Sequence, residues 1–190
     1  MIDKKSLRKQ ILSLRSEMDP MTRKNAEDAI YQSLFTSSHF QNAQVICSFV
    51  SFRDEIEMQP INQDILDQGK TLLLPYITPE KTMVFHKVND LGALKRNHYG
   101  ILEPDPLIHP LFEIHEIDLV LTPGVAFDES GFRVGYGAGF YDMFFSKLNK
   151  AIPRIGIAYE LQVVTNVPKD DYDQPLTHLM TEFKTRTFYN

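Results

Sequence analysis

Short apolar runs alternate along this chain with segments whose apolar residues recur at helical spacing. The runs predict strands at Val45–Phe52, Thr71–Leu74, Met83–Val88, Ile117–Thr122 and Arg154–Tyr159. The helical spacing predicts helices at Asp3–Arg15, Thr22–Phe35, Met58–Gln68 and Phe140–Leu148. This alternation is typical of a three-layer α/β domain with a largely parallel, twisted sheet, in which ligands bind at the carboxyl ends of the strands.

Glycine and proline mark the ends of these predicted elements. Asp19-Pro20 separates the first two helices, Gly69 closes the third as its cap, and Pro75 ends the second strand. Glycines and prolines between Asp90 and Pro110 predict a loop, and the tail Phe183–Tyr189 predicts a short β-rich segment. No repeat, linker or low-complexity tract interrupts the 190 residues, so we expect one domain spanning residues 1–190.

Composition and charge narrow the classes of function. The formal net charge is −5 at pH 7 and no basic block occurs, which argues against a nucleic-acid partner. The first ten residues are too polar for a signal peptide, and no apolar stretch approaches ~18 residues. We therefore expect a cytoplasmic protein without a membrane partner. No long apolar stripe is left unassigned, which favours a monomer.

Cysteine and histidine offer no alternative chemistry. The single cysteine, Cys47, cannot form an internal disulfide, and its place in an apolar run predicts a buried strand residue and not a nucleophile. The six histidines are scattered, and no His/Cys cluster has zinc spacing. We therefore expect no structural metal.

Three alternating glycines precede the last predicted helix, in the segment R-V-G-Y-G-A-G-F-Y-D from Arg133 to Asp142. Gly135, Gly137 and Gly139 can adopt positive φ and leave their amides open to a bulky anion. The start of a helix adds unpaired N–H groups that favour phosphate. The segment lacks the Lys-Ser/Thr ending of a P-loop, and only one residue separates its second and third glycines. A plain tight turn therefore explains the glycines nearly as well.

The residues on either side of the glycines favour the anion site. Arg133 lies two residues before the first glycine, where its planar fork can bind a phosphate. Asp142 follows the last glycine by three residues, in the first turn of the predicted helix. Its carboxylate either complements the helix dipole or, beside bound polyphosphate, supplies the ligand that magnesium prefers.

This loop belongs to a longer segment with a known counterpart. Pro123–Asp142 reads P-G-V-A-F-D-E-S-G-F-R-V-G-Y-G-A-G-F-Y-D and closely resembles the signature of the 5-formyltetrahydrofolate cyclo-ligase family, also called methenyltetrahydrofolate synthetase. The resemblance covers nearly the whole chain. It includes K-x-x-x-R at Lys4 and Arg8, D-E-I-E at Asp54–Glu57, and Asp173 near the C-terminus. Several separated motifs in the same order are more specific than any one of them.

The resemblance implies an enzyme that uses ATP and Mg²⁺ to close 5-formyltetrahydrofolate to 5,10-methenyltetrahydrofolate, releasing ADP and phosphate. Carried over by position, it implies ATP contacts from Lys4, Lys5, Ser6, Leu7, Arg8, Arg133, Val134, Gly135, Tyr136, Gly137, Ala138, Gly139, Phe140 and Tyr141. It implies folate contacts from Val50, Glu55, Tyr99, Tyr136, Gly137, Ala138, Gly139 and Phe140. Asp142 and Asp173 would hold the metal, and the catalytic cations would be Arg133, Lys4 and Arg8.

The charged positions keep alternative interpretations. Lys5 replaces Lys4 if the register shifts by one residue, and Asp170 or Asp171 could replace Asp173. Basic residues on a terminal helix and acidic residues in a turn are usually only solvated.

The folate positions also have alternatives. Glu55 follows a strand, where a surface carboxylate is common, although a carboxylate there also suits the N–H groups of a pterin. Tyr76, Tyr99 and Phe140 could flank the rings of folate or serve as core or surface residues. Lys95, Arg96 and His98 could meet the glutamate tail of the substrate or stay solvated.

Two positions depart from the family pattern. The family often has arginine where Met143 stands and a second aspartate near Thr177. Neither position is central to the phosphate or magnesium argument, so the departures bear on substrate affinity or polyglutamate preference and not on catalysis.

Two rival functions use the same features. A non-catalytic folate- or nucleotide-binding protein could keep the scaffold, and a sugar-phosphate isomerase-like enzyme could bind its ligand by a glycine loop. The isomerase lacks an obvious general base beside the loop and leaves the pairing of Arg133 with Asp142 unexplained. The binding-only protein would be expected to lose Arg133, Lys4 or Asp142, and all three are present.

Overall fold

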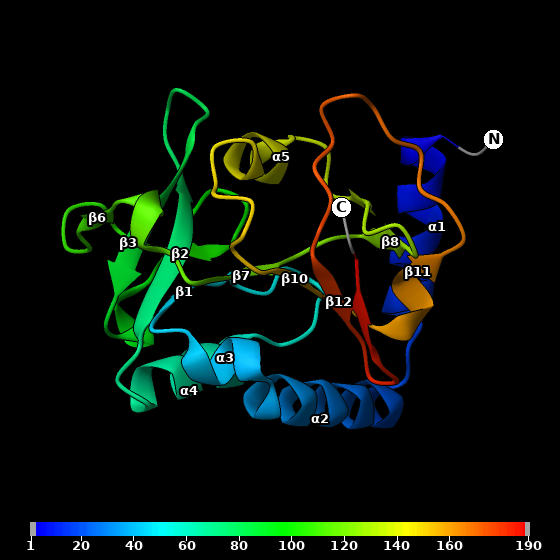
Figure 1. The fold of residues 1–190 in the computed structure, drawn as a ribbon, viewed down its shortest axis with the longest axis horizontal. Coiled ribbons are helices and arrows are strands. Elements are labelled where there is room, and N and C mark those ends of the chain that lie inside the picture. The colour runs from blue at the N-terminus through cyan, green and yellow to red at the C-terminus, as the bar shows by residue number, and fades with distance from the viewer. Residues whose placement is uncertain (1–2, 189–190) are drawn as a thin grey trace.

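A mostly parallel sheet runs through the middle of the molecule (Figure 1). The computed structural model describes residues 3–188 and orders the eight strands of this sheet β13-β12-β10-β7-β1-β2-β3-β6. Five inner strands are parallel: β12 (His178–Met180), β10 (Arg154–Ile157), β7 (Leu119–Thr122), β1 (Val45–Cys47) and β2 (Thr71–Ile77). Three outer strands each pair antiparallel with an inner neighbour: β13 (Thr185–Thr187) with β12, β3 (Met83–Val88) with β2, and β6 (Leu111–Phe112) with β3. The predicted α/β class with a largely parallel sheet is confirmed.

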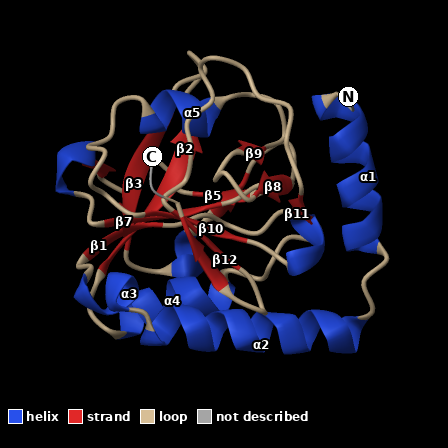
Figure 2. Cartoon of the chain, turned by 45° about the vertical axis from the view of Figure 1, so that its right-hand side comes forward, coloured by secondary structure: helices blue, strands red, loops and turns tan. Residues whose placement is uncertain are grey.

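Helices cover both faces of the sheet, which gives three layers (Figures 1 and 2). One face carries α2 (Pro20–Thr36), α3 (Ser38–Asn42) and α4 (Gln59–Asp67), and the other carries α5 (Phe140–Phe145). A further helix, α1 (Lys4–Ser16), stands beside a second sheet made of β11 (Val163–Val164), β8 (Ala126–Asp128) and β9 (Arg133–Val134). The remaining elements are β4 (Lys95–Arg96), β5 (Leu102–Glu103), η1 (Leu91–Ala93), η2 (Ile114–Glu116) and η3 (Glu160–Gln162).

The sheet is buried on both faces because its side chains alternate between two apolar cores. In β1, Ile46 joins the core covered by α2, α3 and α4, whereas Cys47 joins the core beside α5. In β2, Leu72 and Leu74 join the first core and Leu73 the second. Burying one such side chain contributes roughly 1.5–3 kcal/mol, so even a three-residue strand is held firmly. Cys47 lies in β1 and is buried, as predicted, and burial raises the pKa of its thiol.

The helix boundaries have local causes. Asp3 caps α1 by accepting a hydrogen bond from Ser6 N at 2.8 Å, and Asp19 caps α2 in the same way. Pro20 occupies the first turn of α2, where its missing N–H leaves no helix bond unmade. Gly69 follows α4 with a φ of 71° and closes that helix as predicted.

The first strand is shorter than predicted. It ends at Cys47, and the residues up to Phe52 leave the sheet. Ser48 donates its hydroxyl to the Asn62 side chain at 2.5 Å, and Asn62 donates in turn to Phe49 O at 2.9 Å. Asn62 belongs to α4, so these side-chain bonds hold the chain against that helix in place of further strand pairing.

The second strand is longer than predicted, because Pro75 does not end it. Leu73 O accepts from Ser48 N, so the backbone N–H and C=O groups of Leu73 point toward β1. These groups alternate in direction along a strand, so the backbone nitrogen of Pro75 also points to the β1 side. β1 has already ended at that level. The missing N–H of Pro75 therefore costs no ladder hydrogen bond, and β2 continues to Ile77 in its pairing with β3.

The remaining differences concern short elements. The sequence does not predict α3, β6, β12 or the β11-β8-β9 sheet, and the hairpin β4–β5 lies in the region predicted as loop. The helix predicted to reach Leu148 ends at Phe145 and is followed by a single turn. β13 lies within the predicted β-rich tail, of which Tyr189 falls outside the described residues.

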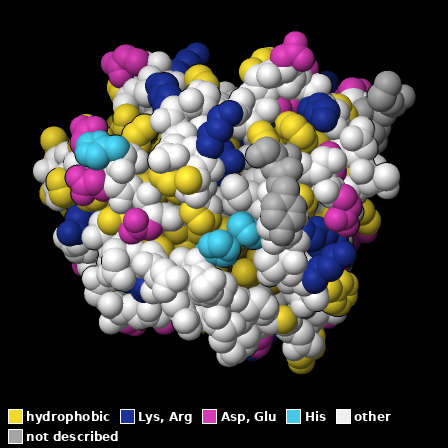
Figure 3. Space-filling view, viewed as in Figure 1, with side chains coloured by type: hydrophobic (Ala, Val, Ile, Leu, Met, Phe, Trp, Pro, Cys, Tyr) yellow, Lys and Arg dark blue, Asp and Glu magenta, His cyan; other side chains and the backbone are white. Residues whose placement is uncertain are grey.

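Charge on the surface is mixed. On the face in Figure 3, Lys and Arg side chains are scattered among acidic ones and form no continuous basic patch. Within residues 3–188, no helix is long and apolar enough to cross a membrane. The lack of a nucleic-acid partner, the cytoplasmic location and the monomeric state stay predictions.

Candidate active site

Helix α1 joins the glycine loop at the carboxyl edge of the parallel strands. Leu7 and Ile11 of α1 pack on Ala126 and Val134 of the second sheet and on Val125, which lies between β7 and β8. Figure 2 shows α1 standing alongside β8, β9 and β11. The polar side of α1 is thereby placed next to the loop that runs from β9 to α5.

The loop has the backbone that its glycines predict at two of three positions. Gly137 has a φ of 114° and Gly139 a φ of 70°, values that side chains of L-residues rarely allow. Arg8 Nε donates to Gly135 O at 2.8 Å, and a Cβ on Gly137 would lie 3.6 Å from Arg8 Nη2. Arg8 therefore lies along the loop. Neither Nη atom of Arg8 has a hydrogen bond within residues 3–188, so both are free to bind an anion.

Lys4 is placed at an acidic turn. Its Nζ donates to Asp173 at 2.6 Å and to Asp170 at 2.7 Å. Burial opposes the charged form of Lys4, but these two carboxylates outweigh it and raise the lysine pKa. Only 9% of the Asp173 side chain is exposed against 50% for Asp170, and Lys5 is exposed. The geometry favours the pair Lys4 and Asp173 over the alternatives weighed from the sequence.

Arg133 and Asp142 form a second charged pair nearby. Arg133 Nη2 lies 3.2 Å from Asp142 Oδ1, and Arg133 Nη1 donates to Gln174 O at 2.9 Å. Burial lowers the pKa of the Arg133 guanidinium, while Asp142 acts in the opposite direction. The guanidinium also lies 4.8 Å from the Phe145 ring centroid. In this state Arg133 is committed to Asp142, and its contact with phosphate stays a prediction.

The two carboxylates predicted to hold magnesium lie close together. Gln174 N donates to Asp142 Oδ1 at 3.0 Å, and Gln174 follows Asp173 directly. Asp142 Oδ2 and Asp173 Oδ1 accept no hydrogen bond from any described residue. The described residues contain no group of three or more His, Cys, Asp or Glu side chains that could hold a metal alone. Two carboxylates with free oxygens fit magnesium, which takes its other ligands from phosphate and water.

Glu55 is not the surface carboxylate that a strand end commonly carries. The residue is 9% exposed, and Oε2 accepts from Phe52 N at 2.9 Å. No described residue approaches Oε1 within hydrogen-bond distance, although the Tyr136 hydroxyl is near enough to lower the Glu55 pKa. Burial raises the pKa of Glu55 to about 7. Phe52 also contacts Tyr136 of the glycine loop edge-on, with ring centroids 5.7 Å apart. Val50, another predicted folate contact, is partly buried between β1 and this turn.

Arg15 belongs to this site although the sequence did not single it out. It is 1% exposed, and its Nη2 donates to the Tyr136 hydroxyl at 2.8 Å. Burial raises the pKa of Tyr136 to about 12, with the nearby Glu55 acting in the same direction. The signal that could have found Arg15 is its spacing, because Lys4, Arg8 and Arg15 recur in phase with the buried face of α1.

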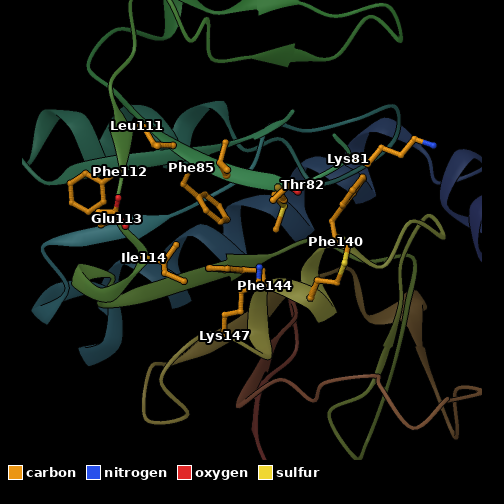
Figure 4. Close-up of a pocket in the computed structure, with 13 residues that line it drawn as sticks. Lys81, Thr82, Phe85, Leu111, Phe112, Glu113, Ile114, Phe140, Phe144 and Lys147 are labelled. Carbon is orange, nitrogen blue, oxygen red and sulfur yellow. The ribbon is translucent and has the colours of Figure 1, made fainter. Parts of the chain in front are cut away.

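A recess adjoins the end of the glycine loop at Phe140. It measures about 270 Å³ and lies between β3, β6 and α5 (Figure 4). Phe85, Phe140 and Phe144 line its apolar part, and Lys81 and Lys147 stand among its polar lining. Phe140 is a predicted folate contact, so the five residues from Tyr136 to Phe140 connect the neighbourhood of Glu55 with this recess.

The places of the other predicted ATP contacts neither support nor oppose their predicted roles. Leu7 and Val134 are core residues, so an ATP contact from them can only use the backbone. Ser6 donates its hydroxyl to Asp3, and Ala138 is exposed in the loop. Tyr141 is partly buried, and its buried hydroxyl has no partner in the part of the chain that the structure describes.

Residues around the β4–β5 hairpin are mostly exposed. Tyr99 is 71% exposed and contacts the His98 ring at a tilt, with ring centroids 3.8 Å apart. Lys95 pairs with Asp105, and Arg96 Nη1 donates to Gly100 O at 2.7 Å. Tyr76 of β2 contacts the ring of His86 edge-on. Contacts from these residues to folate stay predictions.

The chain has relatives among known proteins. A family model of the 5-formyltetrahydrofolate cyclo-ligase family matches residues 1–182. The chain belongs to this family. A 5-formyltetrahydrofolate cyclo-ligase from Haemophilus influenzae is 29% identical over 180 residues, which cover 93% of this chain and 96% of that protein. A probable 5-formyltetrahydrofolate cyclo-ligase from Caenorhabditis elegans is 31% identical over 196 residues, with coverage of 97% and 95%.

The cyclo-ligase resemblance extends to the fold. The NMR structure of a 5,10-methenyltetrahydrofolate synthetase from Aquifex aeolicus superposes with a TM-score of 0.86 at 26% identity, covering 98% of this chain and 93% of that one. A Mycoplasma pneumoniae synthetase shares the fold at 22% identity with a TM-score of 0.78. The family predicted from Pro123–Asp142 is confirmed, while the roles of individual residues stay predictions.

Proposed function

We propose that this chain catalyses the ATP-dependent closure of 5-formyltetrahydrofolate to 5,10-methenyltetrahydrofolate, with release of ADP and phosphate. Family membership over residues 1–182 carries the proposal. The geometry supports it, because one edge of the sheet gathers a glycine loop, free cationic donors and two neighbouring carboxylates. That combination suits a nucleotide triphosphate with its metal ion.

The chemistry explains the need for ATP. A formamide carbonyl is a poor electrophile, and its oxygen leaves badly as hydroxide. When the formyl oxygen attacks the γ-phosphorus, ADP leaves and the oxygen becomes part of a good leaving group. The folate nitrogen at position 10 then adds to the formyl carbon and loses its proton, and phosphate departs to leave the methenyl bridge. The protein contributes by aligning the two reactants and stabilising the spreading negative charge.

The ATP side of the site is assigned to α1 and the loop. Arg8 offers its two free Nη donors beside Gly137, and the loop amides add further N–H groups. Lys4 would exchange its carboxylate partners for phosphate. Asp142 and Asp173 would hold Mg²⁺, which supplies charge neutralisation at the phosphates when bound. Arg133 orients Asp142 by the 3.2 Å ion pair.

The folate side is assigned to the other side of the loop. The unpaired Glu55 oxygen offers an acceptor to the pterin ring, with Val50 beside it. The rest of the molecule would follow the loop from Tyr136 toward the recess at Phe140. Lys81 and Lys147 there suit the carboxylates of the glutamate tail.

The proposal is tested by following the near-ultraviolet absorbance of methenyltetrahydrofolate with freshly reduced substrate. We expect the signal only when ATP and Mg²⁺ are both supplied. If ATP and folate bind but no product forms under any condition, the chain is a binding protein and the proposal is wrong. Turnover of a sugar phosphate without folate would instead support the isomerase alternative.

A further inference from the structure

Arg15 carries unpaired donors inside the protein. Apart from Nη2, which donates to the Tyr136 hydroxyl, its Nε and Nη1 atoms have no hydrogen-bond partner among the described residues. The side chain is 1% exposed. A buried guanidinium with unpaired donors is costly to the folded state, because it has lost water without gaining other acceptors. Such a group indicates a place where a ligand supplies the acceptor.

Arg15 and Glu55 face the same small recess at the carboxyl ends of the strands. Phe49 beyond β1, Pro123 beyond β7 and Ile157 of β10 form its apolar walls. Glu55 Oε1 is the other buried polar atom there that no residue in 3–188 approaches within hydrogen-bond distance, although the Tyr136 hydroxyl is near enough to lower the Glu55 pKa. The recess has no room for even one water molecule, so it offers its two donors and one acceptor to the edge of a ligand and does not enclose one.

Gln162 lines the same recess and provides a contrast. Its Nε2 donates to Gly124 O and Val125 O, and its Oε1 accepts from Tyr159 N. All of its polar atoms are used to hold the chain where β7 ends. Gln162 therefore has a structural role, and Arg15 and Glu55 are left to receive the ligand.

The surroundings of Arg15 favour a neutral ring over a phosphate. Glu55 is close enough to Arg15 for the guanidinium to lower its pKa against the effect of burial. A carboxylate so near would repel an anion. Arg15 also lies seven residues beyond Arg8, roughly 10 Å along the helix axis. The two arginines therefore would contact different ligands, Arg8 the ATP and Arg15 the folate.

We propose that Arg15 donates to the carbonyl oxygen at position 4 of the pterin ring while Glu55 accepts from the ring N–H and amino groups beside it. This inference rests on the proposed function and adds a specificity-determining residue to it. Along that edge of the pterin, the carbonyl oxygen accepts a hydrogen bond, and the ring N–H and the amino group beside it donate. The arginine therefore matches the carbonyl oxygen, and the carboxylate matches the two donors. The formyl group on nitrogen 5 neighbours this carbonyl, so Arg15 also fixes where the reacting oxygen points.

The inference is tested by equilibrium binding without ATP, using calorimetry. The two ligands are 5-formyltetrahydrofolate and its 4-amino analogue, in which an amino group replaces the carbonyl. We expect the wild-type chain to prefer the carbonyl ligand and the Arg15→Met variant to lose at least about tenfold of that preference, the size typical of one lost charge-assisted bond. Arg15→Lys, which keeps a cationic donor, should retain part of it.

Lys70→Met is the matched control, because Lys70 is a buried cation at the amino ends of the strands. We expect it to lower the melting temperature and leave the ratio of affinities unchanged. An unchanged ratio in Arg15→Met overturns the inference, and if that variant does not fold, an unchanged ratio in Arg15→Lys does so. Failure of the wild-type chain to bind either ligand would instead overturn the proposed function.

Discussion

The two ends of the parallel strands differ in how fully their charged side chains are hydrogen-bonded. At the amino ends, Lys70 Nζ donates to three carbonyl oxygens, and Asp118 Oδ2 accepts from Gln44 N and Val45 N at 2.9 Å each. At the carboxyl ends, Arg15 and Glu55 keep buried atoms without partners in the described chain. Arg154, the first residue of β10, also keeps a buried Nε without a partner among the described residues, so the amino edge is more fully paired and not complete. At the carboxyl edge we expect the ligands to complete the hydrogen bonding.

This contrast separates stability from function. Most buried polar atoms in proteins are paired, because an unpaired one costs about 1–3 kcal/mol. The two apolar cores stabilise the fold enough to offset the free-energy cost of unpaired atoms at one edge of the sheet. Substitutions at the amino edge should therefore change stability, and substitutions at the carboxyl edge should change binding and turnover.

The largest effect is expected from two aspartates, one at each edge. Asp142→Asn should lower turnover by roughly 10²-fold or more, because it weakens charge stabilisation around the transferring phosphoryl group, and should raise the magnesium concentration required. Asp118→Asn should lower the melting temperature without changing that requirement. Titrating activity against Mg²⁺ in both variants makes the comparison. Wild-type activity of Asp142→Asn at low magnesium would remove Asp142 from the metal site.

The next largest effect is expected on the KM for ATP, which should respond differently to substitution of two neighbouring lysines. Lys4→Met should raise the KM for ATP by about tenfold, the loss expected for one charge-assisted bond to phosphate. Lys5→Met should leave it within about twofold, since exposed charges contribute little. Initial rates at varied ATP with saturating folate give both values. The reverse order would place Lys5 at the phosphate.

Two glycines with positive φ give a smaller contrast. Gly137→Ala and Gly69→Ala should each cost about 1–2 kcal/mol of folding free energy, because both backbones are left-handed. Only Gly137→Ala should also lower kcat/KM, by several-fold, since Gly69 caps α4 at the amino edge. Chemical denaturation and steady-state kinetics on the same samples test this. Equal kinetics in the two variants would separate the loop from catalysis.

The smallest expected effect is a pH dependence of stability from Glu55. Its pKa is about 7 in the folded protein against a usual 4.5, because burial disfavours the carboxylate. A raised pKa means that its contribution to stability is fully present below pH 4.5 and is lost as the pH rises through about 7. Glu55→Gln should remove that part of the pH profile, measured as unfolding free energy by urea titration. Identical slopes in both proteins would mean that Glu55 titrates normally.

Much of this arrangement follows from local sequence. Apolar alternation predicted Met83–Val88 to the residue, and the first helix was predicted within one residue at each end. The second helix begins at Pro20, two residues before the predicted Thr22. The prediction that Pro75 ends the second strand was wrong. A proline interrupts a strand only where a neighbouring strand would accept its missing N–H, and β1 has already ended at that level. Strands of two or three residues such as β12 have too few positions to show a period.

The site was only partly predictable for the same reason. Arg8 and Gly137 could be paired through a motif, and the structure brings them together. The unpaired state of Arg15 could not be read from the sequence, since it depends on what every neighbouring element offers as an acceptor. Burial of Glu55 likewise depends on the turn from Phe52 folding back over it.

The most direct measurement counts ADP against methenyltetrahydrofolate in the same reaction. If the carboxyl edge holds ATP and folate together, wild-type protein forms one ADP for each methenyl product, and both stop when Mg²⁺ is omitted. Product formed without ADP, or ADP formed at the same rate without folate, would contradict a shared site at this edge of the sheet.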